Sequence, residues 1–150
     1  MKTILITIVL SFFWINLSSS IIIIEPKEEY ATDVDKTIKE IKNVLTIGII
    51  ESNFNNKALN RPENAAGIFQ IRKIMLVEVN RILGKTIYFD SCRFNARKSI
   101  EMFLIVQRAY NPSANFKTAC KLWNGGSINC QDSVITNYWN KAKLTMNKMF

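Results

Sequence analysis

The sequence predicts a single, mainly α-helical domain with at most a short strand element. The chain has 150 residues, 48% of them hydrophobic and 11% aromatic, which suffices for one apolar core. Apolar residues recur at spacings of three and four in several stretches, whereas alternation at every second residue is nearly absent. Residues that begin or stop helices flank these stretches.

The first twenty residues have the anatomy of a secretory signal peptide. The stretch "MKTILITIVLSFFWINLSSS" has one early Lys2, an uncharged apolar run and a small-residue ending. We expect cleavage after Ser20 and a secreted or periplasmic protein. An uncleaved membrane anchor, extended by the isoleucines at 21–24, is the alternative, although the polar "NLSSS" interrupts the apolar run.

An acidic segment follows and leads into the first expected helix. Residues 21–40 carry six of the twelve acids, and residues 21–34 are predicted to be a solvated linker, with the folded domain at 35–150. Asp33 or Asp35 can cap a helix over residues 36–50, in which apolar residues recur at helical spacing. Glu51 stands at the end of this helix.

Four more helices are expected, each with a residue that favours a helix start or stop. They cover residues 74–83 before Gly84, 96–110 after the cap Asn95, 113–123 opened by Pro112 with Ser113, and 134–149 after Asp132 or Ser133. Only residues 85–89, "KTIYF", are predicted as a short strand.

The charge of the folded part indicates a polyanionic partner. From residue 41 onward there are sixteen Lys and Arg against six Asp and Glu, a formal charge of +10. A surface with this charge could bind nucleic acid or an anionic cell wall, or could be solvated without any specific partner. The export signal favours the wall and makes a nucleic-acid binder the weakest interpretation.

Cysteine and histidine usage narrows the possible chemistry. Cys92, Cys120 and Cys130 allow at most one intramolecular bridge, between Cys120 and Cys130 or between Cys92 and either of them. The chain has no histidine, which excludes histidine-dependent hydrolases and zinc enzymes with imidazole ligands. No metal site and no cofactor are predicted. Carboxylates are then the expected groups for general acid–base catalysis.

Glu51 is the strongest candidate among the six acids after residue 40. The other five sit within expected helices, at a cap or in loops: Glu63, Glu78, Asp90, Glu101 and Asp132. Glu51 instead follows "TIGII", where the chain leaves the core. Partial desolvation there, together with the negative end of the helix dipole, raises a carboxyl pKa towards neutrality, as a general acid requires.

Three blocks in order, "ESNFNNKAL", "NAAGIFQI" and "ACKLWNGG", resemble the signature of the lytic transglycosylase SLT family, relatives of goose-type lysozyme in the lysozyme-like superfamily. The blocks span about 80 of the 150 residues. The resemblance implies a lysozyme-like α+β fold with a substrate cleft. It also implies cleavage of the β-1,4 bond between N-acetylmuramic acid and N-acetylglucosamine in peptidoglycan. Trp123 stands where the family usually has Tyr.

The resemblance assigns roles to individual residues. Glu51 would act as the single general acid and then base, giving a 1,6-anhydro product in a variation on the two-carboxylate scheme. The residues expected to contact the sugars, through hydroxyl, amide or aromatic groups, are Ser52, Gln70, Trp123, Asn124 and Tyr138.

The implied partner is the peptidoglycan glycan strand, bound by a monomer that associates with the envelope or membrane. Two other functions remain open on the same fold. One is a muramidase in which water attacks and a reducing end forms. The other is a non-catalytic wall-binding protein.

Overall fold

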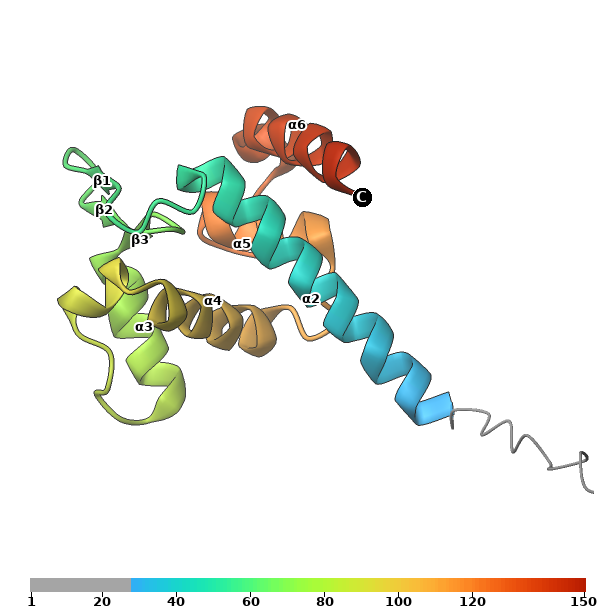
Figure 1. Cartoon of the computed structure of the whole chain (residues 1–150), viewed down its shortest axis with the longest axis horizontal. Helices are drawn as coiled ribbons and strands as arrows, with labels where there is room; N and C mark the ends of the chain where they lie inside the picture. Colours follow the sequence, from blue (N-terminus) through green and yellow to red (C-terminus); the bar gives the residue numbers. More distant parts are fainter. Residues whose placement is uncertain (1–27) are drawn as a thin grey trace, which may run out of the picture. The chain divides into compact units, whose positions relative to one another are not determined.

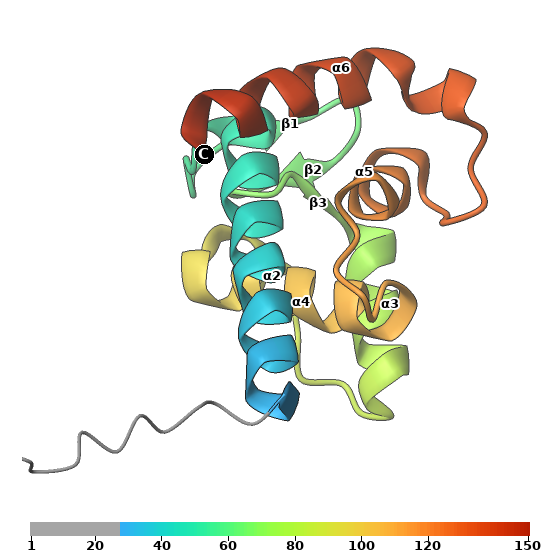
Figure 2. The same cartoon turned by 90° about the vertical axis from the view of Figure 1, so that its right-hand side faces the viewer.

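The computed structural model describes residues 28–150, and these are mainly helical, as the sequence predicts (Figure 1; Figure 2). Residues Thr32–Phe150 form one compact unit. The elements in chain order are α2 (Glu28–Ser52), β1 (Leu59–Asn60), β2 (Ala65–Ala66), β3 (Ile71–Arg72), α3 (Lys73–Leu83), the 3₁₀ helix η1 (Asp90–Phe94), α4 (Ala96–Tyr110), α5 (Phe116–Gly125) and α6 (Asp132–Met149). No helix within this part of the chain is long and apolar enough to cross a membrane.

The first helix begins earlier than its expected caps. Residues 28–34, predicted as linker, belong to α2, because neither proline nor glycine interrupts the chain between Glu28 and Gly48. Asp33 and Asp35 therefore lie inside the helix, where Asp35 pairs with Lys39 at 2.5 Å. The expected signal peptide and residues 21–27 of the expected linker lie outside the described residues.

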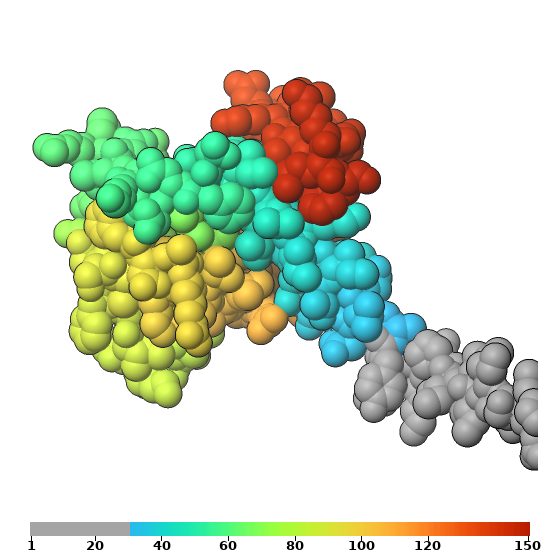
Figure 3. All heavy atoms as spheres, in the orientation of Figure 1, coloured from blue at the N-terminus to red at the C-terminus, as the bar shows by residue number. Residues whose placement is uncertain are grey.

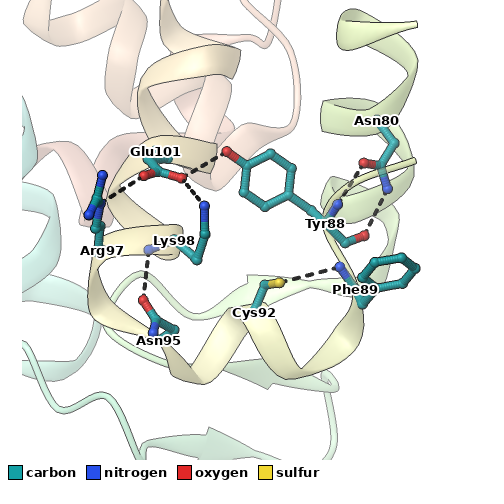
Figure 4. Close-up of polar contacts among 8 residues, drawn as sticks. All are labelled: Asn80, Tyr88, Phe89, Cys92, Asn95, Arg97, Lys98 and Glu101. Carbon is teal, nitrogen blue, oxygen red and sulfur yellow. Dashed lines mark hydrogen bonds and ion pairs between the residues drawn. The ribbon is translucent and has the colours of Figure 1, made fainter. Parts of the chain in front are cut away.

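The strands lie between α2 and α3, not at residues 85–89. β1, β2 and β3 form a small antiparallel sheet in that order, with Leu59 opposite Ala66 and Ala66 opposite Ile71. The prediction of a strand at "KTIYF" was wrong because a side chain takes the place of a partner strand. Asn80 accepts the N–H groups of Ile87 and Tyr88 and donates to the Tyr88 carbonyl. Figure 4 shows the two bonds between Asn80 and Tyr88.

The ends of α3 and α4 are those that the sequence predicts. Gly84 ends α3 in the left-handed conformation, and the Asn95 side chain caps α4 by accepting the N–H of Lys98. On the outer face of α4, Glu101 accepts bonds from Tyr88, Arg97 and Lys98 (Figure 4). Burial and the adjacent Glu101 raise the pKa of Tyr88 to about 12.

The starts of α5 and α6 differ from expectation in detail. Asn115, not Pro112 with Ser113, caps α5 by accepting the N–H and hydroxyl of Thr118, because Ala114 has a positive φ of 53° that a helix cannot include. Asp132 begins α6 but binds Lys117 and Lys121 of α5, which lowers its pKa to about 2.

Two apolar clusters hold the helices together. The larger one joins α2, β3, α3, α4 and α5 around Phe69 and Phe103, whose rings stack at 4.6 Å. The smaller one joins α5 and α6 around Cys120 and Ile135, with Cys130 packed against it. All three cysteines are free thiols in the structure, so none of the possible bridges is formed.

A buried arginine ties η1 to the sheet. Arg93 is 2% exposed and donates to the carbonyls of Asn64 and Ile71 and to the Asp90 carboxylate. These bonds satisfy a buried cation, which would otherwise carry a large desolvation cost. Arg93 thereby fixes the position of the hairpin formed by β1 and β2 (residues 59–66) and of β3 relative to η1.

Candidate functional site

A cavity of about 980 Å³ opens between the C-terminal end of α2, the sheet, α3, the loop after α5 and α6. In the space-filling view, the hairpin (green) and α6 (red) rise on either side of a depression at the end of α2 (Figure 3). Five of the six residues expected at the site line this cavity: Glu51, Gln70, Trp123, Asn124 and Tyr138. The structure thus brings together residues separated by up to 87 positions in the chain.

Glu51 occupies the last turn of α2, with its carboxyl at the cavity wall. Burial raises its pKa, while the hydrogen bond from Tyr138 and the charges of Lys141 and Arg72 act in the opposite direction. The net effect is a raised pKa. This is the direction expected from the position of Glu51 at the edge of the core, and it favours the protonated form of the carboxyl.

Two side chains of α6 meet the end of α2. The Tyr138 hydroxyl donates to Glu51 Oε1 at 2.8 Å, and Lys141 Nζ donates to the Ile50 carbonyl at 3.1 Å. Tyr138 and Lys141 are three residues apart and therefore share a helix face. Lys141 supplies a donor to a carbonyl that the end of a helix leaves unpaired. Burial beside Glu51 raises the pKa of Tyr138, so its hydroxyl stays neutral and can donate.

Ser52 does not line the cavity. Its hydroxyl donates to the Ile68 carbonyl at 2.9 Å and ties the end of α2 to the "GIFQI" segment. Through this bond Ser52 supports the position of Glu51, and its contact with a sugar stays a prediction.

Both amides line the cavity, Gln70 from the turn before β3 and Asn124 from α5. Gln70 has a positive φ of 50°, and its side-chain nitrogen donates to the Gly67 carbonyl at 3.0 Å. That bond leaves the amide oxygen and a second N–H for a ligand. Asn124 is exposed near the end of α5. Planar amides on two walls suit the acetamido and hydroxyl groups of a sugar.

Trp123 belongs more to the core than to a sugar-stacking surface. Its indole N–H donates to the Phe69 carbonyl at 3.1 Å, and its ring packs on Phe69 and Phe103. These contacts use the donor and much of the ring. The remaining edge of the indole forms part of the cavity wall.

Several residues that line the cavity were not singled out from the sequence. The main ones are Glu63, Arg72 and Lys141. Glu63 pairs with Arg72 at 2.9 Å, and both charges act on the pKa of Glu51, in opposite directions. Lys141 follows Tyr138 by three residues, a spacing that places two side chains on the same face of a helix. The sequence could therefore have indicated that Lys141 lies beside Tyr138. The Glu63–Arg72 pair depends on the register of the sheet and has no such signal.

The described residues contain no group of three or more His, Cys, Asp or Glu side chains that could hold a metal ion. Searches against protein-family models, curated proteins and solved structures found no match to this chain.

Replacing Tyr138 with Phe should raise the pKa of Glu51 further. The hydroxyl stabilises the ionised carboxylate, so its loss favours the protonated form. Activity that needs protonated Glu51 would then be lost at a higher pH than in the wild type. Titration of the Glu51 carboxyl carbon by NMR measures the shift directly. Tyr88→Phe is the control, because it removes a similar Tyr–Glu bond outside the cavity and should leave the pKa of Glu51 unchanged. An unchanged pKa of Glu51 in Tyr138→Phe would contradict the contact between Tyr138 and Glu51.

Proposed function

We propose that the protein is an exported peptidoglycan lytic transglycosylase of lysozyme-like fold that cleaves the β-1,4 bond between N-acetylmuramic acid and N-acetylglucosamine. The observation that carries the proposal is Glu51, a desolvated carboxyl with a raised pKa, bonded by Tyr138 and facing a cavity with amide side chains on its walls. The resemblance of the three sequence blocks supports the same substrate.

The first step needs a proton on Glu51. Burial favours the protonated carboxyl, which would transfer its proton to the leaving oxygen of the glycosidic bond. The N-acetyl group of the substrate would stabilise the developing positive charge, so this step needs no second enzymic carboxylate. Gln70 and Asn124 would orient the sugar by hydrogen bonds to its amide and hydroxyl groups.

The second step needs the ionised form of the same residue. The Tyr138 hydrogen bond and the charges of Lys141 and Arg72 stabilise the carboxylate left after the first transfer. The carboxylate would then take the proton of the C6 hydroxyl as that oxygen closes on C1, giving the 1,6-anhydro product. Opposing influences on one carboxyl suit a group that must hold and release a proton in each cycle.

The charge of the folded part fits the same substrate. A net positive surface attracts an anionic wall and raises the local concentration of enzyme on it. Export through residues 1–20 would deliver the protein, acting as a monomer, to the envelope where this substrate lies. Nucleic acid is not proposed as a partner.

Product analysis tests the proposal. Purified peptidoglycan incubated with the protein should release soluble muropeptides that end in 1,6-anhydro-N-acetylmuramic acid. Mass spectrometry distinguishes these products because each is lighter by one water than the product of hydrolysis. Binding to the wall without release of muropeptides would instead indicate a non-catalytic protein.

A muramidase is the second candidate, and one observation favours it. Glu63 is a second carboxylate on the cavity wall, on the turn between β1 and β2, and its charge acts on Glu51. Two carboxylates on either side of a sugar allow one of them to activate water. Glu63, however, is ion-paired to Arg72 in this structure, and this contact occupies one of its carboxylate oxygens.

Replacing Glu63 with Gln separates the two candidates. For the lyase, turnover should change by less than about tenfold and the anhydro product should remain, because loss of a general base costs about 100-fold or more. The pKa of Glu51 should fall, since the negative charge of Glu63 raises it. A large loss of turnover in an enzyme that forms reducing ends would establish the muramidase.

A further inference from the structure

The cavity extends beyond the neighbourhood of Glu51 to a second end on α3 and α4. This α3–α4 end is lined by Ile74, Met75, Glu78, Val106 and Tyr110. The charges that act on the pKa of Glu51 include Glu63, Arg72 and Lys141, and Glu78 is not among them. Ile74 and Met75 lie in the first turn of α3, directly after β3, and Glu78 lies about one turn further along the helix.

The two ends of the cavity differ in chemistry. Besides the charged Glu63, Arg72 and Lys141, the rest of the cavity carries neutral amide and hydroxyl groups, from Asn60, Gln70, Asn124, Ser127 and Asn129. The α3–α4 end has an apolar wall, with Ile74 76% exposed, together with the Tyr110 hydroxyl and one carboxylate, that of Glu78, which is ion-paired with Arg81. Amides and hydroxyls suit sugars, whereas an aliphatic wall with one carboxylate suits a methylene chain that ends in an ammonium group.

Glu78 is held in place before any ligand arrives. Arg81 donates from Nε to one carboxylate oxygen at 2.8 Å and from Nη2 to the other at 2.7 Å, and the Tyr110 hydroxyl donates to the second. The bonds from Arg81 and Tyr110 lower the pKa of Glu78 to about 2, so it is ionised at any physiological pH. A carboxylate has about four acceptor sites, so these three bonds leave capacity for one further donor.

We infer that the α3–α4 end of the cavity binds an aliphatic ammonium group of the substrate, with Glu78 as its acceptor. On the proposed function, on which this inference rests, the group is the side-chain amine of the diamino acid in the peptide stem of peptidoglycan. Ile74 and Met75 contact the methylene chain that carries the amine. The enzyme then recognises glycan strands that bear peptides with a free amine, in preference to naked or cross-linked strands.

A binding experiment on the full chain tests the inference apart from turnover. The probes are a muramyl peptide with a free side-chain amine and the same peptide acetylated on that amine, titrated by calorimetry into Glu51→Gln protein. We expect the free amine to bind at least about tenfold more tightly, as a charge-assisted hydrogen bond allows. Equal affinity of the two peptides would overturn the inference.

Variants locate the effect on Glu78. Glu78→Gln, made in the Glu51→Gln protein, should remove the preference for the free amine and leave binding of the acetylated peptide unchanged. Glu101→Gln is the matched control, because Glu101, like Glu78, is bonded by a tyrosine and paired with cationic side chains (Arg97 and Lys98 here, Arg81 at Glu78) but does not line the cavity. A preference that persists in Glu78→Gln would overturn the assignment.

The comparison of the two peptides in the parent protein needs no variant at Glu78, so a folding defect in Glu78→Gln cannot obscure the result. Failure of the proposed function has a different signature. Wild-type protein would then release no muropeptides from peptidoglycan, whatever the affinities of the two peptides.

Discussion

Replacing Glu51 with Gln is expected to abolish release of muropeptides from purified peptidoglycan while the protein stays folded. The amide of Gln keeps the size of the carboxyl and an oxygen that accepts the Tyr138 hydroxyl, but it cannot deliver or take a proton. General acid–base catalysis contributes about 100- to 10,000-fold, and here one residue would serve both steps. Turnover by Glu51→Gln close to that of the wild type would contradict the proposed mechanism.

The same variant should have a second signature, in stability against pH. Burial raises the pKa of Glu51 above its ordinary value of 4.5, so the folded state binds this proton more tightly than the unfolded state. The tighter binding of this proton stabilises the folded state to its full extent below pH 4.5, and the stabilisation is lost as pH rises through the pKa of Glu51 in the folded protein. Glu51→Gln should therefore become more stable relative to the wild type as pH rises from about 4 towards neutrality, measured by urea denaturation.

Glu101→Gln is the control for this measurement, because the pKa of Glu101 is lowered by folding whereas that of Glu51 is raised, so the stability difference should change with pH in the opposite direction. Bonds from Lys98 and Tyr88 lower the pKa of Glu101, so its stabilising contribution is present above the unfolded pKa and lost as pH falls. Glu101→Gln should thus be less stable than the wild type near neutral pH, with the difference shrinking in acid. A stability difference for Glu51→Gln that does not depend on pH would contradict the raised pKa.

The helices whose ends depend on local chemistry could be predicted from the sequence. Gly84 stops α3 and Asn95 caps α4 by interactions within four residues of the chain, so the local pattern contains the information. The strand predicted at 85–89 failed for the opposite reason. Asn80, from another element, satisfies the backbone of Ile87 and Tyr88, and periodicity alone cannot indicate that contact.

Five of the six residues expected at the site line the cavity, but their arrangement and several of their neighbours could not be predicted from the sequence. The position of Glu51 at the end of an amphipathic helix could be inferred, and burial of that end raises its pKa as expected. The contact of Ser52 with the Ile68 carbonyl and the packing of Trp123 on Phe69 follow from how distant segments meet. The ion pair of Glu63 with Arg72 likewise requires the sheet register, which short strands do not fix in the sequence.

Replacing Gly67 with Ala should destabilise the fold more than any other glycine-to-alanine change. A Cβ at residue 67 would lie 1.7 Å from the Arg93 carbonyl oxygen, and φ is +74°. That carbonyl cannot retreat easily, because it accepts the Ser99 hydroxyl at 2.9 Å and the Arg93 side chain is fixed by its bonds to Asn64, Ile71 and Asp90. We expect a loss of at least about 3 kcal/mol in the free energy of unfolding.

Gly84→Ala is the matched control that separates steric conflict from backbone strain. Gly84 also has a positive φ, +64°, but a Cβ there meets nothing within 4 Å. Strain alone costs about 1 kcal/mol, so the difference between the two variants in urea denaturation measures the conflict with Arg93. Gly67 stands one residue before Ile68, whose carbonyl binds Ser52 beside Glu51, so Gly67→Ala should also lower turnover. Equal losses of stability in the two variants would mean that the sheet moves away from η1 at little cost, and that Arg93 does not fix the hairpin beside the cavity.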